Sequence, residues 1–255
     1  MATKSTDNSQ LKVFHDMGDL CQSAAADFAD MATIAVNDHG AFHVALSGGT
    51  TPRHLHNTLC NDKFRNDIPW KNLHIYWGDE RAVALDHPDS NYRMARESLL
   101  DHVPIPQDQI YPMITDPNHL LAEADKYDAL LRSKLPNGSW MPVFDLVLLG
   151  LGTDGHTASL FPDTDILKVR DRCVCAVYVV RMDTWRISLT LPMINAATHA
   201  MILVSGKGKA DIVYDVFMDT SREVPYPVQW VHPRDGISWY LDKKAVSRLM
   251  QEGST

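Results

Sequence analysis

Short apolar runs that alternate with helix-like segments are the feature that most constrains the fold of this 255-residue chain. Residues 143–149 are apolar at every position except Asp145, which is the pattern of a strand covered on both faces. Residues 186–191 alternate between polar and apolar side chains, which predicts a half-exposed strand. Further strands are predicted at residues 42–46, 73–77, 173–180, 200–204 and 237–241.

Helical patterns separate these predicted strands. Pro52 suits the first turn of a helix with Leu55 and Leu59 on one face. Other helices are predicted after a cap at Ser90 or Asn91, at residues 120–135, from Lys209 to about Met218, and at residues 243–250. The alternation predicts an α/β fold in which helices flank a doubly wound, mostly parallel, Rossmann-like sheet. We expect a single domain over residues 1–255, with residues 1–10 as a flexible N-terminal tail.

The charge balance restricts the class of partner. The chain has 24 Lys and Arg against 32 Asp and Glu, a formal net charge of −8. General nucleic-acid binding depends on counterion release by basic side chains, so we expect no nucleic-acid partner. If the ligand is a small anion, the positive charges must be concentrated locally.

Apolar run lengths and the spacing of cysteines and histidines indicate location and metal binding. No apolar run approaches the roughly 20 residues that a membrane helix needs, and the polar first ten residues lack the apolar core of a signal peptide. We therefore expect a cytoplasmic protein with no membrane partner, either a monomer or a weak homo-oligomer. Four cysteines do not make a disulfide scaffold in a chain of this length, and Cys173 and Cys175 are expected to pack in a strand. No histidine spacing typical of a metal site occurs.

The first candidate site is the turn that follows residues 42–46. Ser47, Gly48, Gly49, Thr50 and Thr51 join a predicted strand to a predicted helix. Glycines allow close approach of the backbone, and free amides at a helix start attract anions. The turn is therefore either a phosphate-binding loop or a tight connection that merely needs glycine.

The second candidate site is the glycine-rich segment after residues 143–149. Residues 150–155 match the dinucleotide fingerprint G-x-G-x-x-G, but Pro162 interrupts the helix that this fingerprint requires, which argues against a nicotinamide or flavin cofactor. His156 has another use, because an imidazole exchanges protons near neutral pH and Asp154 is near enough to orient it. A purely structural histidine is the alternative.

Three basic residues adjoin predicted strand ends. Arg81 follows one strand, Arg186 opens another, and Lys209 begins a helix. Each by itself is typical of a solvated surface charge. Together, at one edge of a sheet, they provide the local positive potential that an anionic substrate needs.

These segments resemble the 6-phosphogluconolactonases of the oxidative pentose phosphate pathway. The resemblance covers residues 45–242 and rests on Ser-Gly-Gly-Thr-Thr-Pro at 47–52, Gly-Asp-Glu-Arg at 78–81 followed by Ser90-Asn91, Gly-Leu-Gly-Thr-Asp-Gly-His-Thr-Ala-Ser-Leu-Phe-Pro at 150–162, Arg-Ile-Ser-Leu-Thr-Leu-Pro at 186–192 and Gly-Lys-Gly-Lys-Ala at 206–210. It implies the fold of glucosamine-6-phosphate deaminases and ribose-5-phosphate isomerases. The deaminases continue after the histidine with an Asn-Glu-Pro-like segment, whereas this chain has Thr-Ala-Ser-Leu-Phe-Pro at 157–162.

The resemblance implies hydrolysis of 6-phosphoglucono-δ-lactone to 6-phosphogluconate without a metal or an organic cofactor. It assigns His156 as the general base, Asp154 as either its orienting partner or a ligand of a sugar hydroxyl, and Arg81 or Arg186 as the partner of the oxyanion or the phosphate. The implied substrate-binding residues are Ser47, Gly48, Gly49, Thr50, Asp79, Arg186 and Lys209. A phosphosugar isomerase or deaminase, and a phosphosugar sensor without catalysis, are the alternatives.

Overall fold

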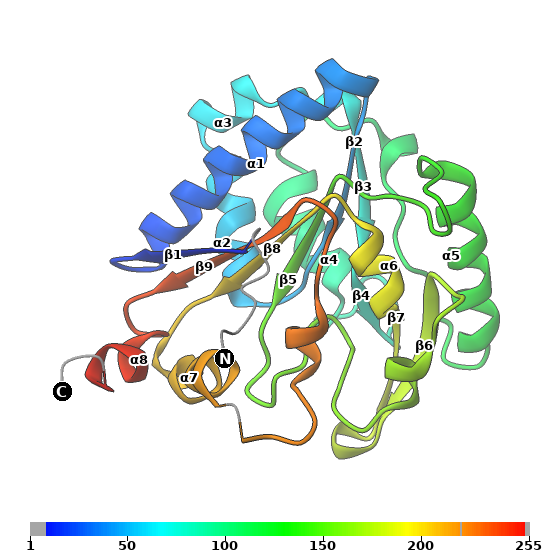
Figure 1. Cartoon of the computed structure of the whole chain (residues 1–255). Helices are drawn as coiled ribbons and strands as arrows, with labels where there is room; N and C mark the ends of the chain where they lie inside the picture. Colours follow the sequence, from blue (N-terminus) through cyan, green and yellow to red (C-terminus); the bar gives the residue numbers. More distant parts are fainter. Residues whose placement is uncertain (1–8, 220, 253–255) are drawn as a thin grey trace.

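A six-stranded parallel sheet forms the centre of the computed structural model, which describes residues 9–219 and 221–252 (Figure 1). The strand order is β1-β9-β8-β5-β2-β3, and every pair is parallel. The strands are β1 (Ser9–Phe14), β2 (Phe42–Leu46), β3 (Leu73–Trp77), β5 (Leu146–Gly150), β8 (His199–Val204) and β9 (Gly236–Asp242). The predicted doubly wound, mostly parallel sheet is confirmed.

The order of the strands places a crevice between β2 and β5. The chain passes from β2 outward to β3 on one side, and from β5 outward to β8 and β9 on the other. Where the direction of winding reverses in this way, the loops after two neighbouring strands separate and leave room for a ligand. The two predicted glycine-rich turns follow these two strands.

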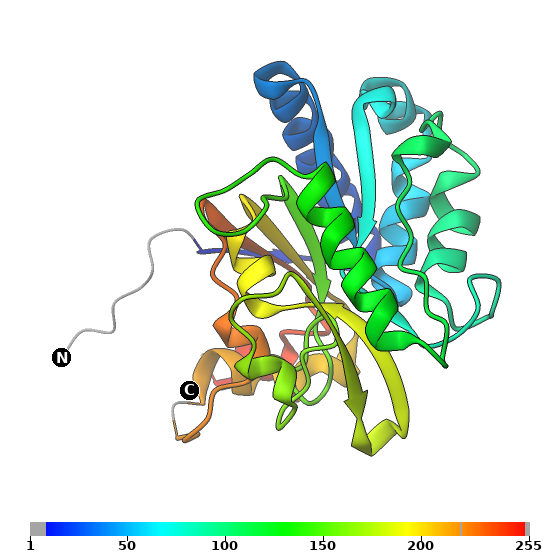
Figure 2. The ribbon, with the colours of Figure 1, turned by 90° about the vertical axis from the view of Figure 1, so that its right-hand side faces the viewer.

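Helices cover the sheet and close its ends. The helix α1 begins at the cap Asp16, whose carboxylate accepts the amides of Gly18 at 2.8 Å and Asp19 at 3.1 Å, and it ends at Gly40, with φ of 87°. It packs on α2, β1, β2 and β9, while α5 packs on the strands β6 and β7 described below (Figure 2). The helices are α1 (Met17–His39), α2 (Thr50–Leu59), α3 (Asp62–Asp67), α4 (Asn91–Ala95), α5 (Leu120–Lys134), α6 (Leu191–Ala196), α7 (Ala210–Met218) and α8 (Ser247–Glu252). None of the helices in the described residues is long and apolar enough to cross a membrane.

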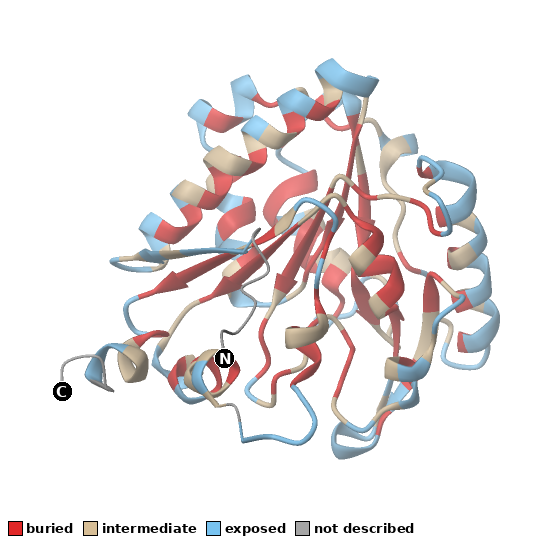
Figure 3. Ribbon diagram, in the orientation of Figure 1, coloured by how far each residue is buried: buried red, intermediate tan, exposed pale blue. Residues whose placement is uncertain are grey.

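A second, three-stranded antiparallel sheet lies beside the first and was not predicted. It has the order β4-β7-β6, from β4 (Asp79–Arg81), β7 (Thr184–Leu189) and β6 (Val174–Val179). The two sheets meet where Gly78 donates to Leu46 of β2 and accepts from Leu189 of β7, both at 2.8 Å. Buried residues of both sheets belong to one continuous core (Figure 3).

Two predictions about individual segments are wrong. Residues 1–10 were predicted as a tail, but Ser9 and Gln10 belong to β1, where they pair with Ile237 and Ser238. A polar segment can form a strand in this way because backbone pairing needs no apolar side chain. Residues 1–8 lie outside the described residues. The predicted half-exposed strand at residues 186–191 has its polar side chains Arg186, Ser188 and Thr190 buried instead. The loop after β5 covers Ser188, which accepts the amide of Ser159 at 3.1 Å.

Two predicted boundaries also shift. The apolar run at residues 143–149 becomes a strand only from Leu146, since Val143 pairs with the loop carbonyl of Pro136. The last helix begins at Ser247 instead of residue 243, because residues 243–246 form turns in which Asp242 accepts the amide of Ala245 at 2.7 Å.

Candidate active site

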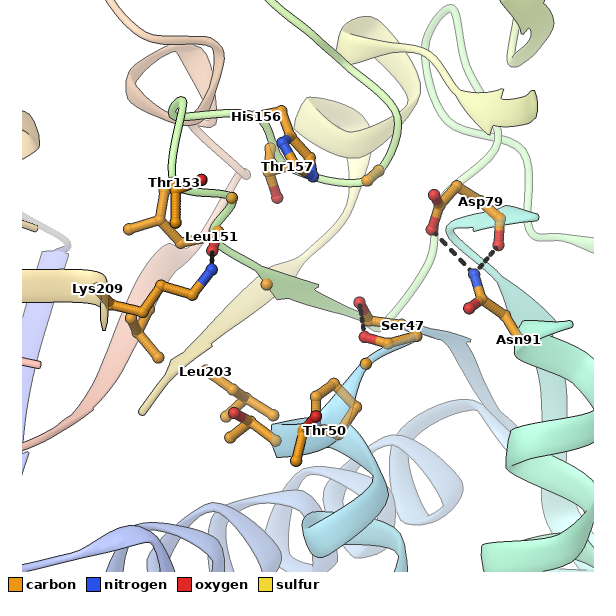
Figure 4. A pocket seen from close by; sticks show the side chains of 18 of the residues that line it. Ser47, Thr50, Asp79, Asn91, Leu151, Thr153, His156, Thr157, Leu203 and Lys209 are labelled. Carbon is orange, nitrogen blue, oxygen red and sulfur yellow. Dashed lines mark hydrogen bonds between the residues drawn. The ribbon is translucent and has the colours of Figure 1, made fainter. Parts of the chain in front are cut away.

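A cavity of about 430 Å³ lies at the carboxyl ends of β2, β5 and β8 (Figure 4). The loop after β2 forms its floor in this view, the loop after β5 lies above, and Lys209 enters from the segment that follows β8. Strands β4 and β7 of the small sheet add Asp79, Arg81 and Arg186 to the lining. The cavity therefore joins segments that are far apart in the chain, from Ser47 to Lys209.

The turn after β2 has the features of an anion-binding loop. Gly49 has φ of 105°, a left-handed conformation that favours glycine, and it precedes α2. Thr50 and Thr51, the first two residues of α2, line the cavity, and backbone amides at the very start of a helix have no partner within it. Gly48 allows the side chain of Asn91 to lie directly against the backbone, where any Cβ atom would overlap the Asn91 amide.

The loop after β5 presents an imidazole whose orientation is determined by a carboxylate. Nδ1 of His156 contacts Oδ1 of Asp154, and the ring stacks on Phe161 with centroids 4.0 Å apart. Because a carboxylate only accepts hydrogen bonds, neutral His156 carries its proton on Nδ1 and has a free lone pair on Nε2. Nε2 has no hydrogen-bond partner among the described residues, and His156 lines the cavity. This ring is arranged to accept a proton from a molecule in the cavity.

The charge of Asp154 is stabilised by its neighbours. Burial alone would raise the pKa of this carboxyl, but the hydrogen bond from His156 and the positive charges of His156 and Arg181 hold the pKa below its usual value. Asp154 therefore stays ionised at neutral pH and remains an acceptor for the imidazole.

Three cations surround the cavity. Arg186 is buried, and burial lowers the pKa of its guanidinium although the charge of Asp79 opposes this shift. Burial also lowers the pKa of Lys209, whose Nζ donates to the carbonyl of Leu151 at 2.6 Å. The Nε atoms of Arg81 and Arg186 have no partner among the described residues. Buried donors without partners are rare in proteins, and an anionic ligand would satisfy them.

Asp79 connects the small sheet to the loop after β5. Its Oδ2 accepts the hydroxyl of Ser159 at 2.6 Å and lies 3.8 Å from a guanidinium nitrogen of Arg186. On the other side the amide of Asn91 donates to the Asp79 carbonyl at 2.9 Å (Figure 4). Among the described residues, Asp79 is the only carboxylate that lines the cavity.

The residues predicted from the sequence converge on this cavity, except one. It is lined by His156, Arg81, Ser47, Gly48, Gly49, Thr50, Asp79, Arg186 and Lys209. Asp154 does not line it and contacts His156 from outside, which agrees with an orienting partner better than with a ligand of a sugar hydroxyl.

Several residues of the site were missed. Asn91, Thr157 and Ser205 line the cavity, and Arg181 pairs with Asp154 from a turn of the small sheet. Asn91 and Thr157 stand inside the motifs that carried the resemblance, so their position was a usable signal. Arg181 carries no such signal, because it lies between two predicted strands with no motif around it.

Known proteins of one family are similar to this chain in sequence and in fold. Residues 15–239 match the protein family described as glucosamine-6-phosphate isomerases/6-phosphogluconolactonase. The chain is 40% identical over 219 residues to 6-phosphogluconolactonase from Synechocystis sp., an alignment that covers 85% of this chain and 88% of the relative. The solved 6-phosphogluconolactonase of Trypanosoma brucei superposes with a TM-score of 0.83 at 29% identity, covering 94% of this chain and 98% of the other. A monomeric glucosamine-6-phosphate deaminase, 20% identical with a TM-score of 0.79 over 94% of this chain and 99% of its own, shares the fold.

Proposed function

Because the chain belongs to the family of glucosamine-6-phosphate isomerases and 6-phosphogluconolactonases, we propose that it is a 6-phosphogluconolactonase. In this proposal it hydrolyses 6-phosphoglucono-δ-lactone to 6-phosphogluconate. The observation that carries the proposal is an oriented imidazole and three cations around one cavity of about 430 Å³. A phosphorylated sugar lactone needs both a proton acceptor beside its carbonyl carbon and positive charge beside its phosphate.

The chemistry requires one proton acceptor and one cationic partner for the oxyanion. Nε2 of His156 removes a proton from water, and the resulting hydroxide forms a bond to the lactone carbonyl carbon. A tetrahedral oxyanion results, and Arg81 or Arg186 stabilises its charge. When the bond from that carbon to the ring oxygen breaks, His156 returns its proton to the departing oxygen. The product is the open-chain acid.

The substrate phosphate binds to the loop after β2 and to the cations that do not contact the oxyanion. The free amides at the start of α2 attract anions, and the hydroxyls of Ser47 and Thr50 add donors on the same side of the cavity. Lys209 enters the cavity beside the loop after β5 as a point charge. Together these groups hold the substrate at the end of the sheet.

The residues after His156 favour a lactonase over a deaminase. The isomerase type of reaction moves protons between sugar carbons and needs a carboxylate close to the substrate. Residues 157–162 contain none, and Asp79 is engaged by Ser159 and Arg186. Ammonia release from glucosamine 6-phosphate would establish the deaminase instead.

The test is direct measurement of lactone opening by purified protein. A pH-stat follows the acid released, with the spontaneous reaction subtracted. We expect His156→Ala to lower kcat by about 10²- to 10⁴-fold, the usual contribution of a general base, with little change in phosphosugar binding. His54→Ala, an exposed histidine on α2, is the matched control.

Three results would contradict the proposal. Wild-type protein that binds phosphosugars without hydrolysing the lactone would be a sensor. Near-normal turnover by His156→Ala would show that His156 is not the general base. A chelator that lowers the rate would be the third such result. We expect no effect, because the only cluster with metal-ligand spacing in the described residues, His15, Asp16 and Asp19, lies outside the cavity.

A further inference from the structure

The turn Val180–Met182 between β6 and β7 brings Arg181 from the small sheet to the loop after β5. Arg181 forms an ion pair with Oδ2 of Asp154, and the same guanidinium lies 3.5 Å from Nδ1 of His156. Its carbon atom lies 4.9 Å from the centre of the Phe161 ring, on which His156 also stacks. Arg181 thus contacts each group that determines the position of the imidazole.

The two oxygens of Asp154 have different partners. Oδ1 contacts His156, both at Nδ1 and, at 3.4 Å, at the backbone amide, whereas Oδ2 faces Arg181. The side chain of Asp154 is 17% exposed and that of Arg181 is 49% exposed. The contact with Arg181 is an ion pair rather than an aligned hydrogen bond, since Oδ2 has no hydrogen-bond donor in the described residues. Arg181 therefore holds the carboxylate from its solvent side.

Arg181 does not line the cavity, in contrast to Arg81, Arg186 and Lys209. Direct contact with the substrate is thus assigned to those three cations and not to Arg181. We propose that Arg181 is a positioning residue for the general base: it holds Asp154 in place, and Asp154 in turn keeps Nε2 of His156 directed at the cavity. This inference rests on the proposed lactonase function and adds a role that no motif in the sequence indicates.

The charges around His156 predict how the base responds when Arg181 is removed. Asp154 stabilises the imidazolium, and Arg181 opposes it both directly and by balancing Asp154. Lys209 acts on Asp154 from the cavity side, and Arg186 lies across Phe161, 5.8 Å from the ring centre. Without Arg181, less positive charge offsets the negative charge of Asp154, so the imidazolium becomes more stable. The base then loses its proton only at higher pH.

The experiment compares Arg181→Met with Arg181→Lys over pH 5–9. For Arg181→Met we expect kcat to fall about 10- to 100-fold, because a base displaced by a fraction of an ångström takes the proton from water less efficiently. KM should stay within about twofold, since the phosphate contacts are intact, and the acid limb of kcat/KM should move up by roughly half a unit to one unit. Arg181→Lys keeps the charge but not the planar fork, so the acid limb should return while kcat recovers only in part.

A matched control and two outcomes decide the matter. Arg170→Met removes an exposed arginine whose side chain, within residues 9–219 and 221–252, donates only to the carbonyls of Leu167 and Val169, and we expect it to behave as wild type. If Arg181→Met raises KM and leaves the acid limb in place, Arg181 binds the substrate phosphate and the inference is wrong. If kcat and the acid limb are both unchanged, Arg181 has no part in the reaction and the inference is equally wrong.

A readout that needs no turnover separates this inference from the proposed function. The titration of the His156 ring, followed by NMR and assigned with His156→Gln, should shift to higher pH in Arg181→Met. If wild-type protein fails to hydrolyse the lactone but this shift occurs, the proposed function fails while the coupling of Arg181 to His156 stands. If wild type is active and the titration does not move, only the inference fails.

Discussion

Glycine at position 152 is required by the side chains of His156 and Asp154 and not by the backbone conformation. A Cβ atom on Gly152 would overlap both the ring of His156 and the carboxylate of Asp154. The two side chains therefore fold back over the loop that carries them, and only glycine leaves them room. In the sequence this residue belongs to a dinucleotide-like fingerprint, but in the structure it accommodates an imidazole.

Gly152→Ala should therefore inactivate the enzyme. The added methyl group pushes the imidazole away from Asp154, so we expect kcat to fall by at least about 10²-fold, as for the loss of a general base. Lactone hydrolysis measures the effect, and near-ultraviolet circular dichroism verifies that the variant is folded. Gly208→Ala is the control, because a Cβ atom there meets nothing within 4 Å. Normal turnover by Gly152→Ala would contradict this account.

Most residues of the candidate site could be predicted because they stand at strand ends within recognisable motifs. Parallel strands bring their carboxyl ends to one edge, so residues such as Ser47 and His156 meet in space although they are far apart in the chain. Arg181 could not be predicted, since its role depends on how the small sheet lies against the loop after β5. Likewise, the sequence does not indicate that Asp154 contacts His156 and does not line the cavity, because this depends on the direction of the side chain.

At the scale of elements, β4 and α4 are joined through one buried carboxylate. Glu80 accepts the backbone amides of Arg81, Asn91 and Tyr92, each at 2.8 Å, and the hydroxyl of the cap Ser90 at 3.0 Å. Burial raises the pKa of Glu80 above its usual value, although these four hydrogen bonds partly oppose that increase. The arrangement fixes Asn91, which contacts Asp79 at the cavity.

Glu80→Gln should destabilise the protein by about 2–4 kcal/mol, because the amide NH₂ faces donors and leaves buried N–H groups unsatisfied. Urea unfolding followed by fluorescence gives the free energy of unfolding. Glu97→Gln, which removes an exposed partner of Arg93 on the adjoining turn, should change it far less. If the two variants lose the same free energy of unfolding, the buried hydrogen bonds of Glu80 do not contribute the stability that we assign to them.

Strand positions were predictable where an apolar run stops at a turn. β2 and β3 have the predicted bounds, since Ser47 and Gly78 end each run. Val143 and Phe144 are apolar because they pack in the core or on its edge, and a packing pattern does not reveal which residues pair along the backbone. Nor does a single strand indicate its neighbour, so the antiparallel sheet β4-β7-β6 and the parallel partner of β1 could not be foreseen.

The molecule as a whole contains histidines that are buried as neutral groups. Burial lowers the pKa of His43 and of His56 to about 4, helped at His43 by the neighbouring His74 and at His56 by Arg53. His43 stacks on His74 with ring centroids 4.7 Å apart, and Nδ1 of His56 lies 2.9 Å from the hydroxyl of Ser98. In the unfolded chain both rings titrate at about 6.5.

Stability should therefore fall as the pH falls from about 6.5 toward 4. The unfolded state takes up protons in this range while the folded state does not, so each histidine costs about 2 kcal/mol at pH 5 and nothing above pH 7. Urea unfolding at pH 7.5 and pH 5 measures the loss. In His56→Gln the difference between the two pH values should shrink by about 2 kcal/mol, whereas in His54→Gln, an exposed neighbour, it should persist. An unchanged difference in His56→Gln would contradict the assignment.

Asp79 has a consequence for recombining this enzyme with its relatives. The carboxylate of Asp79 contacts Ser159 in the loop after β5 and Arg186 in β7. The backbone carbonyl of Asp79 accepts a hydrogen bond from the side chain of Asn91 in α4. A chimaera whose crossover falls between Asn91 and Ser159 would combine the aspartate of one parent with the hydroxyl and guanidinium of the other. Gene shuffling in this family should therefore yield active hybrids mainly when those segments are inherited as one block.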